Sequence, residues 1–403
     1  MVVALAAAYL AAARLGLSVA TVGRSVTLVW PPTGISLAAL FLLGRRHWPG
    51  IALGAFLVNV LTPGVPAAAA LGMAAGNTLE AVAAASALHW LGMDRTLGRM
   101  RDVLALVAVA ALASPVLSAT VGVASLRLGG VLPAPATTSA WVDWWTGDML
   151  GDLIVAPALF TWSSQAVLRS LRPRALEAVA SLAVTAGVAV TVFSGVPWLE
   201  PVFKPLPYMV FPSLVWMALR YGPAGGAAAS LAVAVPAVLE TVAGRGPMVE
   251  ASLGASLLGL DMFLAVASVT TLLLSALAAE RERALALREE FIALASHELR
   301  TPLTPLKIQL QLLRRASSDP ELPRHLDPVD RQVGRLARLV EDLLDTSRLA
   351  SGSWTLHYER VDLGALARDV VANLSTELEA AGCGADVSVS GPVDGQWDQA
   401  RLQ

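Results

Sequence analysis

The sequence predicts a mainly α-helical protein: a polytopic membrane domain of eight to ten spans, then a helical hairpin, then a short α/β segment. Three observations support this fold class. The 403-residue chain is 55% hydrophobic and 15% charged, with a mean hydropathy of +0.62, whereas soluble domains carry about 25% charged residues. The acidic residues concentrate toward the C-terminal end, and leucines recur there at helical spacing. A wholly soluble or disordered chain is therefore excluded.

The distribution of charge divides the chain into two parts. Residues 1–279 contain 11 acidic and 14 basic side chains, whereas residues 280–403 contain 20 and 15. No proline or glycine interrupts the boundary, SVTTLLLSALAAERERALALREEF at 268–291. We therefore expect a membrane domain over 1–278 and one unbroken helix that passes from lipid into water through a linker at 279–290.

Long apolar runs in the first part predict the membrane spans, because a helix needs about 20 residues to cross a bilayer. The runs lie near 2–22, 27–43, 48–62, 67–91, 102–125, 141–162, 176–194, 205–220, 224–243 and 254–278. Arginines concentrate in alternate connections, at 45–46, 95–101, 169–174 and 281–283. By the positive-inside rule, ten spans with both ends in the cytoplasm fit this pattern. Several runs are short or interrupted by Gly or Pro, so eight spans is the alternative count.

Three motifs place polar or aromatic residues at membrane depth, where they are costly and often functional. They are WPPTG at 30–34, GNTLE at 76–80 and WWTGDMLGD at 144–152. The candidate sensing residues in these motifs are Trp30, Pro31, Asn77, Glu80, Trp145, Asp148 and Asp152. The acidic groups could instead form buried hydrogen bonds between helices, and the tryptophans could anchor the membrane interface. The single cysteine, Cys383, excludes a disulfide within the chain and a cysteine-cluster metal site, and no metal ligands are predicted.

Together these motifs resemble the MASE-type membrane-associated sensor domain of bacterial signalling proteins, over about residues 1–275. The resemblance rests on WPPTGISLAALFLLGRRHWPG, GNTLEA and WWTGDMLGDLIVAPAL. It implies a multi-pass sensor in the bacterial inner membrane with its C-terminal part in the cytoplasm. It implies no particular ligand residue, so the stimulus stays unnamed.

Leucines at spacings of three and four predict an amphipathic helix after the linker. They are Leu299, Leu303, Leu306, Leu310 and Leu313, and a second stripe follows at Val329, Val333, Leu336, Val340 and Leu343. Two antiparallel helices of this size cannot bury both stripes alone. We therefore expect a homodimer in which two hairpins form a four-helix bundle.

His297 lies on the opposite side of the first helix from the leucine stripe, beside Glu298. Neutral imidazole is a good nucleophile toward phosphorus, and a neighbouring carboxylate can orient it or accept its proton. Thr301, one turn on, could hold a water molecule, and Pro302 should loosen or kink the helix. The alternative interpretation is that His297 is an ordinary surface residue on a solvated helix.

The segment FIALASHELRTPLTPL resembles the H-box of sensor histidine kinases, in a dimerisation and phosphoacceptor (HisKA) domain over 291–352. The resemblance implies that His297 receives the γ-phosphoryl group of ATP and passes it to an aspartate of a response regulator. It implies that Glu298 assists this transfer, that Glu298 and Thr301 support phosphatase activity, and that Pro302 marks the helix kink.

Residues 353–403 resemble the beginning of the ATP-binding domain of such kinases. The pattern predicts a strand at 354–360, a helix at 361–381 with Asp362 as a possible N-cap, and a strand at 385–390. The Asn-containing helix and Gly-rich boxes that would hold Mg²⁺ and ATP do not occur in the sequence. ATP and Mg²⁺ are therefore expected for a full-length kinase, and this chain is not expected to bind them or to act alone.

The sequence therefore predicts a membrane-bound sensor histidine kinase of a two-component system, with an incomplete catalytic domain. Its expected partners are a second copy, a cytoplasmic response regulator, the lipid bilayer and an unnamed stimulus. A net charge of -2 gives no field that would attract nucleic acid. The alternative is a transporter or channel with a regulatory dimerising tail, indicated by the intramembrane acids. A non-catalytic phosphoacceptor is a third reading.

Overall fold

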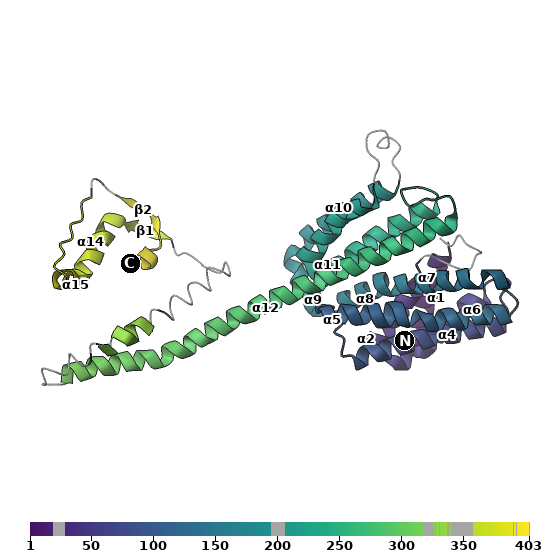
Figure 1. Ribbon diagram of the computed structural model, residues 1–403, viewed down its shortest axis with the longest axis horizontal. Coiled ribbons are helices and arrows are strands. Elements are labelled where there is room, and N and C mark those ends of the chain that lie inside the picture. Colours follow the sequence, from purple (N-terminus) through teal and green to yellow (C-terminus); the bar gives the residue numbers. More distant parts are fainter. Residues whose placement is uncertain are drawn as a thin grey trace. The chain divides into compact units, whose positions relative to one another are not determined.

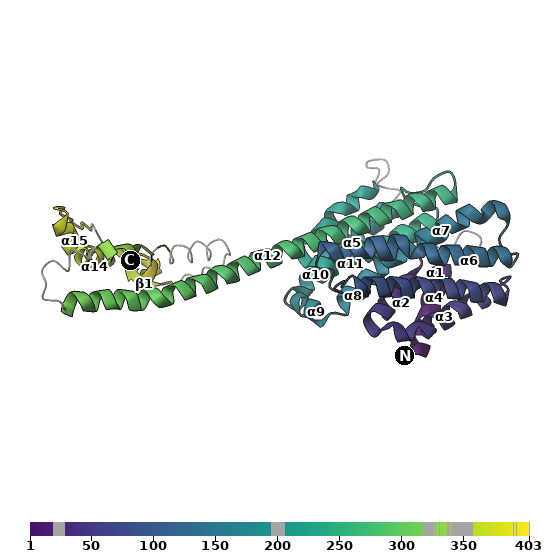
Figure 2. The same ribbon diagram turned by 60° about the horizontal axis from the view of Figure 1, so that its bottom comes forward.

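The computed structural model contains two compact units, Met1–Arg283 and Ala284–Gln403. The structure describes residues 1–18, 29–194, 206–316, 326, 328–329, 331–336, 339, 358–389, 391 and 393–402. Both units are built mainly from helices (Figures 1 and 2). The predicted fold class, a mainly α-helical protein with a polytopic membrane domain, is confirmed.

The first unit is a bundle of helices joined by short connections (Figure 1). In chain order they are α1 Val2–Ser18, α2 Pro31–Leu43, α3 Trp48–Val60, α4 Ala67–Trp90, α5 Met100–Ala105, α6 Pro115–Leu128, α7 Thr137–Leu150, α8 Ala156–Trp162, α9 Gln165–Leu171, α10 Ala175–Phe193, α11 Phe211–Val242 and the first part of α12 Leu253–Ala316. Two π-helical segments, Leu106–Ala113 and Gly151–Val155, connect α5 to α6 and α7 to α8. π-Helical segments are rare in proteins, and those that do occur often lie at functional sites.

Short 3₁₀ turns and a break interrupt the α-helices of this bundle. The turns are Arg45–His47, Ala134–Ala136, Arg172–Arg174 and Pro207–Val210. Within α11, Gly222 has φ 63° and ψ −155°, so the helix is interrupted by a sharp kink. Only glycine adopts a positive φ without steric cost. The break lies between the two apolar runs expected at 205–220 and 224–243.

Two apolar clusters form the core of the first unit. One joins α1–α4 with parts of α5, α8 and α12, and its largest fully buried side chains include Tyr9 and Phe160. The other joins α7, α10, α11 and α12 around Phe193. Helix α12 contributes Leu260 and Leu264 to the second cluster and Leu272 to the first. It therefore packs on both halves of the bundle before it leaves the unit.

Within the described residues, four helical stretches are long and apolar enough to cross a bilayer on their own. They are Met100–Leu128, Gln165–Phe193, Pro207–Val242 and Leu253–Ile292. The helices Val2–Leu17 and Pro31–Leu43 are apolar but shorter. Each predicted run therefore contains helix, with its ends shifted by a few residues, and the first unit is a membrane domain.

Helix α12 continues without interruption to Ala316, which confirms the unbroken helix predicted across the charge boundary. Pro302 and Pro305 both lie inside it, so neither proline ends the helix. Among the described residues of the second stripe, 331–336 are helical and Val333 is buried. Val340 and Leu343 lie outside the described residues.

The described part of the C-terminal segment, from residue 358 onward, contains an antiparallel pair of short strands and three helices. They are β1 Glu359–Asp362, α14 Leu363–Asn373, α15 Ser375–Ala380, β2 Asp394–Trp397 and α16 Gln399–Leu402. The strands pair Glu359 with Trp397 and Asp362 with Asp394. The Asp362 carboxylate accepts a hydrogen bond of 2.8 Å from the backbone N–H of Gly364, which confirms the predicted N-cap.

The prediction of a strand at 385–390 is wrong. Residues 385–389 have no regular structure, and residues 394–397 pair with β1 instead. Val389 of this segment lies against Gly364 at the start of α14. The helix predicted at 361–381 is divided at Leu374, and the strand predicted at 354–360 begins only at Glu359; residues 354–357 lie outside the described part.

Candidate functional site

The three polar motifs of the membrane domain meet around Asp148 on α7. Its Oδ1 accepts a 2.6 Å hydrogen bond from the Thr33 hydroxyl of α2. Its Oδ2 accepts a 2.7 Å bond from the Ser118 hydroxyl of α6. The Trp30 backbone N–H donates to the Gly147 carbonyl at 2.9 Å, which fixes the start of α2 against α7. Segments more than 100 residues apart in the sequence are thereby held at one buried point.

Glycines let these helices approach closely. A Cβ at Gly34 would meet the Gly151 carbonyl oxygen, and a Cβ at Gly151 would meet the carbonyl oxygen of Trp30. A Cβ at Gly122 would lie 2.6 Å from the Trp144 ring. Small residues at helix interfaces in membranes allow the backbones to come together. The glycines of the motifs therefore have a packing role.

Two more carboxyl groups, Glu80 and Asp152, lie beside Asp148. Both are almost fully buried, and Glu80 Oε1 and both Asp152 oxygens have no hydrogen-bond partner among the described residues. No described Lys or Arg side chain forms an ion pair with any of the three. The described residues also contain no group of three or more His, Cys, Asp and Glu side chains that could hold a metal ion.

A cavity opens next to this cluster, between α1, α3, α4, α6 and α7. Its lining includes three of the predicted sensing residues, Trp30, Asn77 and Asp148. Glu80 and Asp152, beside Asp148, are not part of its lining. Pro31 lines a separate, mainly apolar cavity against α11. The structure therefore brings most, but not all, of the predicted sensing residues together.

The Trp145 side chain is not part of the lining of this cavity. Its indole N–H donates to the Leu112 carbonyl oxygen at 3.0 Å. Its ring stacks on that of Trp141, with centroids 6.3 Å apart and an interplanar angle of 8°. The hydrogen bond ties α7 to the π-helical segment Leu106–Ala113, whereas the stacking lies within α7.

Helix α7 also contacts α12, the helix that leaves the membrane domain. The carboxyl group of Asp261 on α12 lies beside the Thr146 hydroxyl on α7. Asp261 is buried, as is Thr146. Leu150 and Leu153, just after the Asp148 site, pack in the same cluster as Leu260 of α12. A shift of α7 at the cavity would therefore reach α12 directly.

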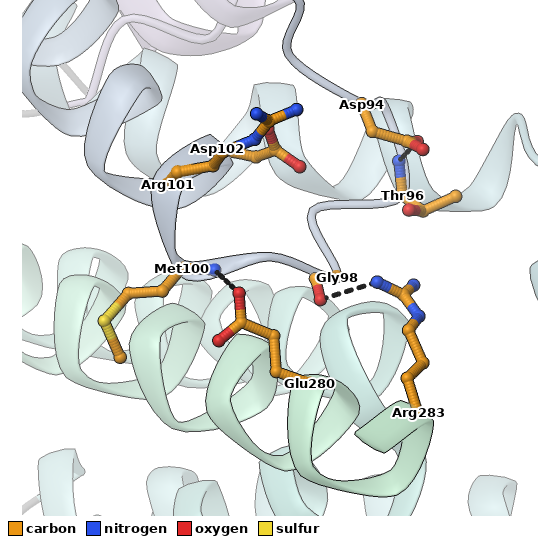
Figure 3. Close-up of polar contacts among 8 residues, drawn as sticks. All are labelled: Asp94, Thr96, Gly98, Met100, Arg101, Asp102, Glu280 and Arg283. Atoms are coloured by element: carbon orange, nitrogen blue, oxygen red, sulfur yellow. Dashed lines mark hydrogen bonds and ion pairs between the residues drawn. The ribbon is translucent and has the colours of Figure 1, made fainter. Parts of the chain in front are cut away.

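A second contact to α12 lies where the helix leaves the membrane domain (Figure 3). The Met100 backbone N–H donates to Glu280 Oε1 at 2.9 Å, and Arg283 Nη1 donates to the Gly98 carbonyl oxygen at 2.9 Å. We call residues 94–100 with Glu280 and Arg283 the exit junction. Any side chain at Gly98 would meet the Arg283 guanidinium.

The loop of the exit junction is preorganised. Leu97 is fully buried and has a φ of 51°, a left-handed conformation that costs a leucine free energy. The Thr96 backbone N–H donates to Asp94 at 2.8 Å. Burial alone would raise the pKa of Asp94, but the bonds from Thr96 and the positive charges of Arg99 and Arg283 lower the pKa below its usual value. Asp94 is therefore charged at neutral pH and attracts Arg283.

Glu280→Ala removes the acceptor of the Met100 amide, so we expect that amide to exchange with solvent about tenfold faster. A hydrogen bond to a charged group contributes about 1.5–3 kcal/mol, and 1.4 kcal/mol corresponds to a factor of ten. Hydrogen–deuterium exchange read by mass spectrometry on the peptide containing Met100 measures this change. Glu282→Ala is the matched control, because Glu282 is exposed on the same turn. Equal exchange in both variants would show that Glu280 does not hold the loop.

The predicted phosphoacceptor segment lies within α12, in the second unit. His297 is helical; its side chain is outside the described part. Glu298, Thr301 and Pro302 are exposed on the helix. Of the leucine stripe, Leu310 is buried, whereas Leu299, Leu306 and Leu313 are between 41% and 52% exposed. The apolar stripe is therefore left largely uncovered within one chain.

Sequence reasoning missed several residues of the Asp148 site. Ser118 and Tyr9 sit in apolar helices without a motif, and Asn77 Nδ2 donates to the Tyr9 hydroxyl at 2.9 Å. Thr33 lies inside the WPPTG motif, but it was not predicted as a sensing residue. A hydroxyl in an otherwise apolar span was the available signal, but many serines and threonines only bond to their own helix, as Thr78 does to the Ala74 carbonyl.

Comparison with known families agrees with this architecture. Residues 1–282 match the MASE1 family, and residues 287–352 match the His Kinase A (phospho-acceptor) domain. The first match covers more than half of the chain, so the chain belongs to the MASE1 family. It carries a phospho-acceptor domain directly after the membrane domain. No solved structure matches the chain.

Three curated relatives each match about a quarter of the chain. Over 109 residues the chain is 40% identical to the probable sensor histidine kinase TcrY of Mycobacterium tuberculosis, covering 27% of this chain and 20% of that protein. Over 110 residues it is 36% identical to the sensor histidine kinase MtrB of Mycobacterium leprae, covering 27% and 19%. Over 93 residues it is 34% identical to the two-component system protein A of Emericella nidulans, covering 23% and 14%. The chain thus spans a fifth or less of these relatives, and none of them is a transporter or channel.

Proposed function

We propose that this protein is a sensor histidine kinase of a two-component system, with His297 as its phosphoacceptor. The observation that carries the proposal is the position of the phospho-acceptor match on α12, a helix continuous with the MASE1 domain. The sensor histidine kinase relatives support the same assignment. We propose domain limits of 1–278 for the membrane sensor, 279–290 for the linker, 291–352 for the phosphoacceptor domain and 353–403 for part of an ATPase domain.

In the proposed reaction a ring nitrogen of His297 attacks the γ-phosphorus of ATP. An N–P bond forms, the bond from the γ-phosphorus to the bridging oxygen of ADP breaks, and the proton released from the ring passes to Glu298. Transfer to an aspartate of the response regulator then breaks the N–P bond and forms an acyl phosphate. ATP use follows from the family; Mg²⁺ would neutralise the phosphate charge, and we assign no residue of this chain to it.

The proposed assembly is a homodimer in the bacterial inner membrane, with the second unit in the cytoplasm. The exposed stripe of Leu299, Leu306 and Leu313 supports dimerisation, because a second hairpin would bury it. The arginine pattern of the connections supports the orientation. The proposed partner in the cytoplasm is a response regulator.

We propose that the stimulus acts on the Asp148 site of the membrane domain. The coupling runs from α7 to α12 through Thr146 and Asp261, and the exit junction holds α12 where it leaves that domain. A stimulus shifts the equilibrium only if it binds one of two arrangements of these helices more tightly. Such a shift along α12 would favour phosphorylation or dephosphorylation at His297.

Two variants separate the proposed roles next to His297. Glu298→Gln removes the proton acceptor, so autophosphorylation should slow by about 100-fold or more. Thr301→Ala leaves the acceptor and His297 in place, so autophosphorylation should persist while dephosphorylation of the regulator slows by about tenfold or more. Radiolabelled ATP with the gene product in native membranes measures the first rate, and phosphorylated regulator measures the second. Equal loss of both activities in both variants would contradict the division of roles.

A further inference from the structure

An open groove lies where α2 and α4 end, on the side of the membrane domain that the proposed orientation places toward the cytoplasm. Its volume is about 460 Å³, within the range of roughly 300–1,000 Å³ that is typical of small-molecule sites. Its walls are the last turns of these two helices and the loop that follows α4, which belongs to the exit junction from residue 94 onward. The groove therefore joins the surface of the bundle to the loop that holds α12.

The groove carries positive charge. Arg95 and Arg99 line it and are exposed, and no ion pair joins either guanidinium to a carboxylate of the described residues. Arg45 adds a third charge close by, because its Nη1 donates to the Ser86 hydroxyl at 3.1 Å, and Ser86 lies one turn before His89 of the lining. Guanidinium groups present paired N–H donors that suit the oxygens of a phosphate.

The lining also contains a carboxylate, Asp94, which does not cancel this charge. Asp94 accepts a hydrogen bond of 2.8 Å from the Thr96 backbone N–H, and it lies near both Arg99 of the groove and Arg283 of α12. Its negative charge is thus divided between the amide and two guanidinium groups. Two arginines and one aspartate leave the lining with a positive net charge, concentrated at Arg95.

The part of the groove that α2 forms is apolar. Phe41 and Leu42 are half-buried there, and the Phe41 ring packs against the His89 ring with centroids 4.3 Å apart. The next residue along each helix, Leu43 on α2 and Trp90 on α4, is exposed, by 45% and 85%. Exposed apolar side chains at the ends of membrane helices contact lipid, and tryptophan is typical of the headgroup level. The groove therefore places a basic surface next to the hydrocarbon region.

We propose that this groove binds an anionic glycerophospholipid of the cytoplasmic leaflet. The phosphodiester accepts hydrogen bonds from Arg95 and Arg99, and an acyl chain lies along Phe41 and Leu42. Basic pockets between membrane helices on the cytoplasmic side bind lipid head groups in this way. A free phosphate ion would use the arginines but leave the apolar wall uncovered. A zwitterionic lipid would cover that wall but would bring no net negative charge.

Lipid binding reaches the signalling helix through Asp94. Arg99 of the groove and Arg283 of α12 both attract this carboxylate. A phosphate bound at Arg99 offsets the positive charge on one side of Asp94, which strengthens the attraction of Asp94 for Arg283 and holds α12 more firmly at the exit junction. A regulatory effect of the lipid rests on the proposed kinase function. The binding itself does not, so the two can fail separately.

The test is native mass spectrometry of the purified protein in detergent, titrated with phosphatidylglycerol or with phosphatidylcholine that has the same acyl chains. We expect phosphatidylglycerol to bind at least tenfold more tightly. Arg95→Gln removes one charge and should weaken its binding about fivefold, and Arg95→Gln with Arg99→Gln about 20-fold or more. Phosphatidylcholine binding should stay unchanged in both variants.

Arg169→Gln is the matched control. Arg169 is an exposed arginine on α9, in another of the arginine-rich connections, and it does not line the groove. The substitution removes the same charge from the same side of the membrane domain, so phosphatidylglycerol should bind as tightly as it does to the wild-type protein.

A second variant keeps the proposal testable if loss of Arg99 disturbs the exit junction. Arg95→Glu reverses the charge of an exposed side chain and should weaken phosphatidylglycerol binding about 20-fold or more, with an unchanged elution volume. Equal affinity of the wild-type protein for the two lipids would overturn the proposal. So would wild-type affinity in Arg95→Glu protein that elutes normally, an equal loss in Arg169→Gln protein, or displacement of the lipid by an equal concentration of inorganic phosphate. Phosphorylation of His297 in the same preparations tests the kinase assignment independently.

Discussion

Replacing His297 with Gln abolishes phosphoryl transfer from ATP, to the background of the assay, while the protein still inserts into the membrane. Glutamine keeps similar bulk and helix propensity but has no nucleophilic ring nitrogen, so no N–P bond can form. Radiolabelled ATP and native membranes that contain the gene product measure the label. The share of the protein that is found in the membrane fraction measures its insertion.

The control for this variant is His325→Gln, the same substitution in another histidine of the second unit. It should retain wild-type labelling, because the resemblance to the H-box lies in FIALASHELRTPLTPL around His297, and His325 is outside that segment. Stable label on the His297→Gln protein would contradict the assignment of the acceptor.

Gly151→Ala should lower the stability of the membrane domain by about 1–3 kcal/mol, the usual cost of overpacking a close-packed interior. The added Cβ would meet the backbone carbonyl oxygen of Trp30, and backbone atoms cannot rotate away as a side chain can. The start of α2 would have to shift from α7, which strains the bond from Thr33 to Asp148. Thermal unfolding of the purified protein in detergent measures the loss.

Gly187→Ala is the matched control, since Gly187 also lies inside a helix, α10, but has no atom within 4 Å of the added Cβ. It should be neutral or stabilising by up to about 1 kcal/mol, because alanine favours helices over glycine. If both variants unfold at the wild-type temperature, the close packing of α2 on Gly151 is not needed for stability.

Much of the fold could be predicted because apolar length and charge distribution determine where helices cross a membrane. The runs at 67–91 and 102–125 correspond to helical stretches, and the absence of Pro or Gly at 268–291 correctly predicts a continuous α12. The π-helical segment Gly151–Val155 could not be predicted, because it depends on the fit of α7 and α8 against α2. The prediction of a strand at 385–390 was wrong for a similar reason, since a strand forms only where a partner strand lies beside it.

The membrane site could be predicted only in part. Motifs identified Asn77 and Asp148 because polar groups at membrane depth are unusual. The partners that position them, Tyr9 and Ser118, come from helices distant in the sequence, and only the packing of α1 and α6 brings them in. The contacts of the exit junction use backbone atoms of Gly98 and Met100, and backbone groups carry no sequence signal.

The central claim is that His297, on the helix continuous with the MASE1 domain, carries the phosphoryl group. The most direct measurement is mass spectrometry of the labelled protein after digestion at neutral or mildly alkaline pH, which preserves the N–P bond. The account predicts a single acid-labile phosphoryl group on the peptide that contains His297. A phosphoryl group that survives acid, or one located on any other peptide, would contradict it.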